Sequence, residues 1–289
     1  LAAAVAAVTL AVVLQPTEGW AGVLTAGLYG TTLALGGALF LAIQVVSGAR
    51  WWFPLRRVPL RLARTLPVPL AAVGLALALG LGTLYPWARS AVVEASPLLQ
   101  AKHAWLNPPL FLARAVGLAI AWLALVGALR AALDAAIQRP PPEARRRLVR
   151  ASLVFLPVFA VTLSVAAWDW GMSLEPEWFS TMYGVLLFAG TFQGGIAAVT
   201  ALALLLDRQG GLDAPLGDPG RHDLGKLLFG FSTFWAYVWF VIQPRLIYDA
   251  LGIYLPYPEF TMDAACWREA WSRVAGPLEY VSAFLSQWF

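Results

Sequence analysis

The sequence has 289 residues, of which 60% are hydrophobic and only 12% are charged, and its formal net charge is +4. Soluble domains have about 25% charged residues, so this composition excludes an ordinary water-soluble fold. The basic residues lie in short segments between apolar blocks, a pattern of membrane topology and not of nucleic-acid binding. Because many blocks reach the length of about 20 residues that a membrane crossing requires, we expect an all-α, polytopic transmembrane helix bundle.

The apolar blocks predict about eight spans in a single integral membrane domain covering residues 1–289. The first block is short for a span and lacks the features of a signal peptide, so we interpret it as the end of a helix that begins upstream. The last block contains charged residues and fits a short span, an interfacial helix or the start of a hairpin. The expected spans cover residues 1–14, 21–46, 66–87, 108–132, 151–168, 178–206, 224–247 and the ambiguous segment 271–289.

The distribution of arginine among the loops predicts the orientation of the bundle in the membrane. Arginines cluster after the second, fourth and sixth expected spans, and the loops retained in the cytoplasm are the ones rich in Lys and Arg. We therefore expect the loops near Arg57, Arg146 and Arg208 to be cytoplasmic. Residues 15–20 and 169–177 contain no Lys or Arg, so we expect these segments to face outward.

Few residues are available for redox cofactors. The only histidines, His103 and His222, are expected on opposite sides of the membrane, so this chain should not hold a bis-histidine haem by itself. With Cys266 as the single cysteine, neither an intrachain disulfide nor a four-thiolate iron–sulfur cluster can form. We expect no metal and no redox cofactor bound by this chain alone.

The ionisable residues near the outer ends of the spans are candidates for function, because charge is costly in a membrane. Arg114 lies about two turns inside the fourth expected span, where it can snorkel outward, pair with an acid or contact a partner. Asp169 ends the fifth span. The tryptophans and carboxylates that surround it favour a surface covered by another subunit, with these candidate contacts: Trp170, Glu175, Glu177 and Trp178.

A polar cluster introduces the seventh expected span on the inner side. Asp223 and Lys226 are three residues apart and share a helix face, which fits a capping and ion-pair cluster. The alternative is the mouth of a proton path that continues through hydroxyl groups. The candidates for such a path are Asp169, Tyr183 and Ser164 on the outer side, and His222, Asp223, Lys226, Ser232, Thr233 and Tyr237 on the inner side.

Glycines recur inside the expected spans, where they allow close helix packing. They include Gly36, Gly37, Gly74, Gly80, Gly82, Gly190 and Gly194.

Two segments, residues 169–184 and residues 222–237, resemble signature segments of the F subunit of alternative complex III. That complex is a bacterial quinol:cytochrome c oxidoreductase, and its C and F subunits are similar to the NrfD and polysulfide-reductase membrane anchors. The resemblance implies four-helix bundles in a bacterial inner membrane, beside a sister NrfD-like subunit. It also implies multihaem cytochrome c and iron–sulfur subunits on the outer face, which hold the haem c and the clusters.

The resemblance leaves the role of the chain open between a proton conduit and a structural partner, with quinone binding unassigned. Residues 243–248 and 254–259 depart from the family pattern, in which only Gln243 and Tyr248 match, so no role is carried over to residues 243–270. The alternatives are a quinone-binding NrfD-like anchor of another respiratory oxidoreductase and a secondary transporter. The absence of a repeated pattern of broken spans argues against the transporter.

Overall fold

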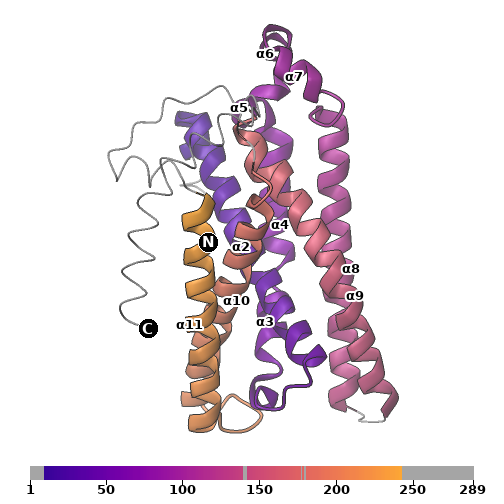
Figure 1. Cartoon of the computed structure of the whole chain (residues 1–289), viewed down its shortest axis with the longest axis vertical. Helices are drawn as coiled ribbons and strands as arrows, with labels where there is room; N and C mark the ends of the chain where they lie inside the picture. The colour runs from indigo at the N-terminus through magenta and orange to yellow at the C-terminus, as the bar shows by residue number, and fades with distance from the viewer. Residues whose placement is uncertain (1–9, 139–141, 177, 179, 243–289) are drawn as a thin grey trace, which may run out of the picture. The chain divides into compact units, whose positions relative to one another are not determined.

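Figure 1 shows a computed structural model of the chain, which describes residues 10–138, 142–176, 178 and 180–242. All regular secondary structure in these residues is helical. The predicted all-α class is therefore confirmed for the part of the chain that is described. Most of the first expected span, the segment 271–289, the divergent residues 243–270 and Glu177 lie outside it.

Five helical segments in the described ranges are long and apolar enough to cross a membrane. They are Pro16–Val46, Phe53–Leu79, Pro108–Ile137, Pro142–Leu174 and Tyr183–Arg208. These segments support a membrane-spanning helix bundle, whereas the count of about eight spans stays a prediction. Helix α11 (Gly217–Ile242), which covers most of the expected span 224–247, is not among the five.

Several helices extend beyond the predicted spans. Helix α8 (Pro108–Gln138) ends six residues after the expected residue 132, and α9 (Pro142–Ala166) begins nine residues before the expected residue 151. The reason is that hydropathy detects only the apolar part of a helix, whereas the backbone remains helical through polar turns at the membrane surface. Proline at the first position of both helices fits these starts, because the missing N–H has no intrahelical acceptor there.

Other predicted spans are too long. The expected span 66–87 is interrupted at Gly80, which ends α4 (Pro67–Leu79) and precedes the short helix α5 (Leu81–Leu84) and the 3₁₀ turn η2 (Pro86–Ala88). The expected span 178–206 begins only at Tyr183, the first residue of α10 (Tyr183–Arg208).

Helix α2 (Pro16–Val46) is the centre of the bundle. It packs against α4, α9, α10 and the short helix α3 (Val58–Ala63), and every residue in the range 34–42 is buried. A helix that is buried on all sides in this way must be apolar all round, as this stretch is.

Helices α2 and α10 cross at close range through Gly36 and Gly195. A Cβ on Gly195 would lie 2.6 Å from the Cα of Gly36, and one on Gly36 would lie 2.7 Å from the Cα of Gly195. Gly36 was among the predicted packing glycines, but its partner is one residue beyond the predicted Gly194. Gly190 and Gly194 instead face the side chains of Trp235 and Leu33.

The described parts of the arginine-rich segments lie together at one end of the bundle, which we call the arginine end (residues 47–64, 130–138, 142–147 and 207–226). Asp213, in the loop between α10 and α11, pairs with Arg56 at 2.8 Å and with Arg57 at 3.4 Å. Asp134 on α8 pairs with Arg64 at 3.7 Å. In Figure 1 the end of α8, the start of α9 and the α10–α11 connection lie at the bottom, opposite α6 (Ser90–Ala95) and α7 (Pro97–Lys102).

The opposite end is the cap, which consists of the described residues 85–107, 167–176, 178 and 180–182. It contains His103 at the end of α7, while His222 lies in the first turns of α11 at the arginine end. The two histidines are therefore at opposite ends of the bundle, whereas their placement on opposite sides of a membrane stays a prediction.

We predict that Gly195→Ala destabilises the protein by about 1–3 kcal/mol. The added methyl group would clash with backbone atoms of Gly36 on α2, which cannot move aside as a flexible side chain could. Unfolding of the detergent-solubilised protein by sodium dodecyl sulfate measures the change.

Gly117→Ala is the matched control, since a Cβ there has no atom within 4 Å. It should leave stability unchanged or raise it slightly. Equal effects of the two substitutions would contradict the close crossing.

Candidate functional site

The candidate site is built around Asp169, at the cap end of α9. The α-helix gives way there to one π-helical turn, η3 (Ala167–Gly171), followed by the 3₁₀ turn η4 (Met172–Leu174). A π turn contains an extra residue and therefore changes the direction in which the following side chains point. Asp169 lies in the middle of this turn, and its side chain is 0% exposed.

Arg114, near the start of α8, forms an ion pair with Asp169. Its Nε donates a hydrogen bond to Oδ2 at 2.6 Å, and its Nη2 donates one to Oδ1 at 3.1 Å. The Arg114 side chain is only 14% exposed. Of the three readings of Arg114 from the sequence, the structure therefore supports pairing with an acid. Two-point contacts of this kind fix the relative orientation of the two groups.

Trp105, in the segment before α8, completes the cluster. Its indole N–H donates to Asp169 Oδ1 at 2.8 Å, and its carbonyl oxygen accepts from Arg114 Nη2 at 3.1 Å. The guanidinium carbon of Arg114 lies 4.2 Å from the centre of the indole ring, a cation–π distance. Trp105 thus binds both charged partners and covers them on the cap side.

The site was only partly visible in the sequence. Asp169 and Arg114 were singled out, but nothing predicted that they pair with each other or that Trp105 contacts both of them. The contact spans 55 residues between Arg114 and Asp169, so spacing along one helix cannot reveal it.

Two further side chains tie the segment after α5 to the π turn and its continuation. The Tyr85 hydroxyl donates to the carbonyl oxygen of Trp170 at 2.9 Å, and the Trp87 indole N–H donates to that of Ser173 at 3.0 Å. Tyr85 follows α5 and lies outside the five apolar segments. Burial, with a smaller contribution from the charge of Asp169, raises its pKa above the usual range, so the hydroxyl keeps its proton and remains a donor.

Trp170 is part of the core of this chain. It is 2% exposed and packs edge-on against Trp122 of α8, with ring centres 5.5 Å apart. Its predicted contact with a partner subunit does not fit this burial, because the π turn directs the side chain inward. Glu175 and Trp178, by contrast, are exposed and remain candidates for such a contact.

Some donors at the site are not used. Arg114 Nη1 and Trp170 Nε1 are buried, and neither has a hydrogen-bond partner among the described residues. Each can donate to one additional acceptor, such as a water or a carbonyl oxygen.

The outer proton-path candidates gather near this site. A Cβ on Gly171 would lie 2.5 Å from the Tyr183 hydroxyl, and one on Gly184 would lie 3.0 Å from Ser164 Oγ. Tyr183 and Ser164 therefore flank the junction between α9 and α10, next to the π turn that holds Asp169.

The inner candidates are not brought into the bundle interior of the described residues. Tyr237 is 64% exposed, and Thr233 is also exposed, with its hydroxyl bonded to the Phe229 carbonyl oxygen. Asp223 and Lys226 form a pair at 3.8 Å on the helix surface, which fits the capping and ion-pair interpretation. His222 is exposed, and Ser232 is half-buried.

Comparison with known proteins found no matching protein family and no matching curated protein. The resemblance to the F subunit therefore rests on the two sequence segments alone and stays a prediction. Within the described ranges, no three His, Cys, Asp or Glu side chains are grouped as metal ligands would be.

We predict that Arg114→Gln and Asp169→Asn each lower the free energy of unfolding by about 3–5 kcal/mol, because each leaves a buried charge without its partner. The double variant should lose clearly less than the sum of the single losses, as expected for a direct pair. Unfolding by sodium dodecyl sulfate in detergent micelles measures all three.

Lys226→Gln is the control, because it removes one member of the exposed pair with Asp223, and pairs of this type contribute little. Strict additivity of the two site substitutions would show that Arg114 and Asp169 are not coupled.

Proposed function

We propose that this chain is a membrane subunit of a quinol-oxidising complex of the alternative complex III type, in which it supports quinol oxidation carried out by partner subunits. In this proposal it acts beside a sister NrfD-like subunit and beneath multihaem cytochrome c and iron–sulfur subunits. Haem c and iron–sulfur clusters belong to those partners, and this chain contributes structure and not redox chemistry.

The observation that supports the proposal best is the construction of the cap around residues 169–184, one of the two segments that carry the resemblance. The buried pair of Asp169 with Arg114 holds the beginning of this segment rigid. Beyond it, Glu175 and Trp178 are exposed. A rigid base that presents an exposed aromatic and acidic loop suits docking of a subunit on the outer side, because ordering that loop costs little entropy on binding.

A proton-conducting role is a narrower part of the proposal. Asp169, Tyr183 and Ser164 supply titratable and hydroxyl groups near the cap, but both carboxylate oxygens of Asp169 already accept hydrogen bonds from Arg114 and Trp105. Thr233 and Tyr237 are exposed on α11, so a water chain along them would need cover from outside the described residues.

The second candidate is a quinone-binding anchor of another respiratory oxidoreductase. The unused donors of Arg114 Nη1 and Trp170 Nε1 favour it, because quinone oxygens accept hydrogen bonds in buried surroundings. The identity of the partner proteins separates the two candidates: a multihaem cytochrome c supports the first, and a molybdopterin protein supports the second.

We predict that the arginine end faces the cytoplasm and that the protein lies in the inner membrane. With Cys266→Ser as background, a membrane-impermeant maleimide added to intact spheroplasts should label Glu175→Cys, and should label Arg146→Cys only after permeabilisation. The Lys and Arg asymmetry between the two ends is the reason. Labelling in the reverse pattern would refute this orientation.

We also predict that the full chain, affinity-purified from its native membrane, retains a multihaem cytochrome c, an iron–sulfur subunit and a second membrane subunit. Trp178→Ala combined with Glu175→Lys should lower the yield of the outer subunits about fivefold or more, since an interfacial tryptophan typically contributes over 1 kcal/mol. Mass spectrometry and haem staining measure the yield.

The matched control is Phe53→Ala with Glu143→Lys, which makes a similar change at the arginine end, where Phe53 and Glu143 are exposed. It should leave the outer subunits bound. Purification of the chain with a molybdopterin protein, or with no partner, would contradict the proposal.

A further inference from the structure

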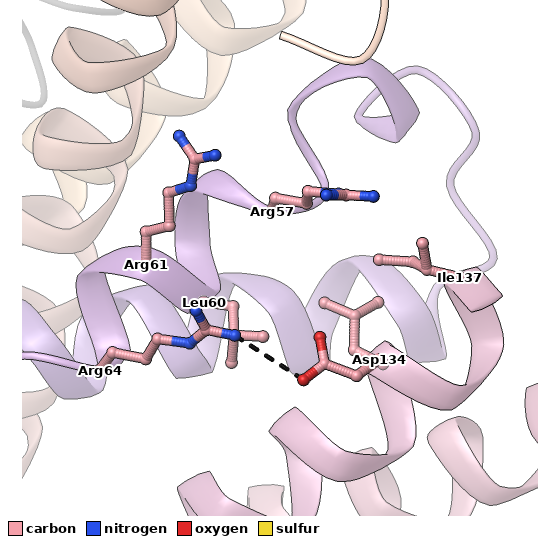
Figure 2. Close-up of a pocket in the computed structure, with 7 residues that line it drawn as sticks. Arg57, Leu60, Arg61, Arg64, Asp134 and Ile137 are labelled. Atoms are coloured by element: carbon pink, nitrogen blue, oxygen red, sulfur yellow. Dashed lines mark ion pairs between the residues drawn. The ribbon is translucent and has the colours of Figure 1, made fainter. Parts of the chain in front are cut away.

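A basic pocket lies at the arginine end, between α3 and the last turns of α8, and the cap site plays no part in it. Figure 2 shows side chains of this pocket from both helices. Its lining residues are Arg57, Leu60, Arg61, Arg64, Leu133, Asp134 and Ile137.

The spacing of the three arginines brings them to one side of α3. Arg57, Arg61 and Arg64 follow one another at intervals of four and three residues, so they occupy neighbouring positions along a helix face. Figure 2 shows Arg64 reaching toward Asp134, whereas Arg61 extends away from it. Three guanidinium groups therefore border the pocket: those of Arg57 and Arg64 extend toward α8, and that of Arg61 extends away from Asp134.

The nearby acids do not neutralise these guanidinium groups. Asp134 lies 3.7 Å from Arg64 and also 3.7 Å from Arg130, so two cations share one carboxylate. Asp213 is likewise shared, at 2.8 Å from Arg56 and 3.4 Å from Arg57.

Arg61 has no ion pair among the described residues, and its side chain is exposed. Within the part of the chain that the structure describes, five arginines against two aspartates leave this region strongly positive, and Arg61 has no carboxylate partner.

Aliphatic side chains form the floor and the edge of the pocket. Leu60 and Leu133 are almost fully buried beneath it, and Ile137 lies half-buried at its edge, at the end of α8. Cationic groups next to aliphatic side chains, where helices meet the membrane surface, form an amphipathic pocket. Its ligand should combine an anionic group with an apolar part.

Membrane topology alone can explain arginines at this end, but it does not require them to line a pocket. Arg145, Arg146 and Arg147, in the first turns of α9, are arginines that topology alone explains. They are exposed, and none of them lines the pocket.

We propose that this pocket binds the phosphate headgroup of an anionic phospholipid of the cytoplasmic leaflet. Arg57, Arg61 and Arg64 contact the phosphate oxygens, to which guanidinium groups donate paired hydrogen bonds. Ile137, at the edge of the pocket, contacts the glycerol and the first methylene groups of the acyl chains. A free phosphate ion offers the same anionic chemistry but lacks an apolar part to contact Ile137.

Titration of the delipidated full chain with phosphatidylglycerol, followed by native mass spectrometry, tests this site. Phosphatidylcholine with the same acyl chains and inorganic phosphate serve as the comparison probes. The intact protein should bind phosphatidylglycerol in preference to both. The variant with Arg57→Gln, Arg61→Gln and Arg64→Gln should bind it about tenfold more weakly, because it loses the charge-assisted hydrogen bonds.

The matched control carries Arg145→Gln, Arg146→Gln and Arg147→Gln, with the same change in net charge, and should keep the affinity of the intact protein. Equal losses in both variants would overturn the proposal in favour of general surface charge. Equal binding of phosphatidylcholine, or displacement of phosphatidylglycerol by millimolar inorganic phosphate, would overturn the assignment of a lipid.

If circular dichroism shows that the triple variant does not fold, two variants with single substitutions test the site instead. Arg61→Gln removes no ion pair seen in the described residues and should weaken phosphatidylglycerol binding about threefold, as one of three cationic contacts. Arg145→Gln should have no effect. Equal affinities of these two single variants would contradict the site.

Discussion

A carboxylate removed from water needs a cation beside it, and the cap of this bundle is organised around that requirement. Asp169 is fully buried, and Arg114 and Trp105 provide its ionic and hydrogen-bonding partners. These contacts join the segment before α8, the start of α8 and the end of α9. Tyr85 and Trp87 then attach the segment after α5 to the backbone just beyond the carboxylate. The position of the outer loop therefore depends on one buried charge.

Hydropathy and the positive-inside pattern were sufficient to predict a helical bundle and to separate its two ends. The loops rich in arginine do lie together, held by Asp213 and Asp134, because charges that cannot enter the membrane collect at its surface. Helix limits were less accurate, as at α9, whose polar first turns continue the helix without contributing to hydropathy.

The details of the site depended on contacts that the linear sequence does not contain. Asp169 and Arg114 each stood out as costly charges, but their pairing results from the packing of α8 against α9. Trp170 points inward because it lies in a π turn, and no sequence pattern in residues 167–171 predicted that turn. For α11, which side chains face inward depends on its rotation against α10, so Thr233 and Tyr237 were assigned to an interior that they do not reach.

The crossing of Gly36 and Gly195 also bears on what the bundle can let through. Where two backbones touch, neither water nor a lipid tail fits between them, so the contact between α2 and α10 closes the bundle to water and ions at this point. A helix bundle that crosses a membrane needs such contacts, since a continuous gap between its helices would let water and ions cross. Any route for ions or quinones through this part of the chain must pass around that contact.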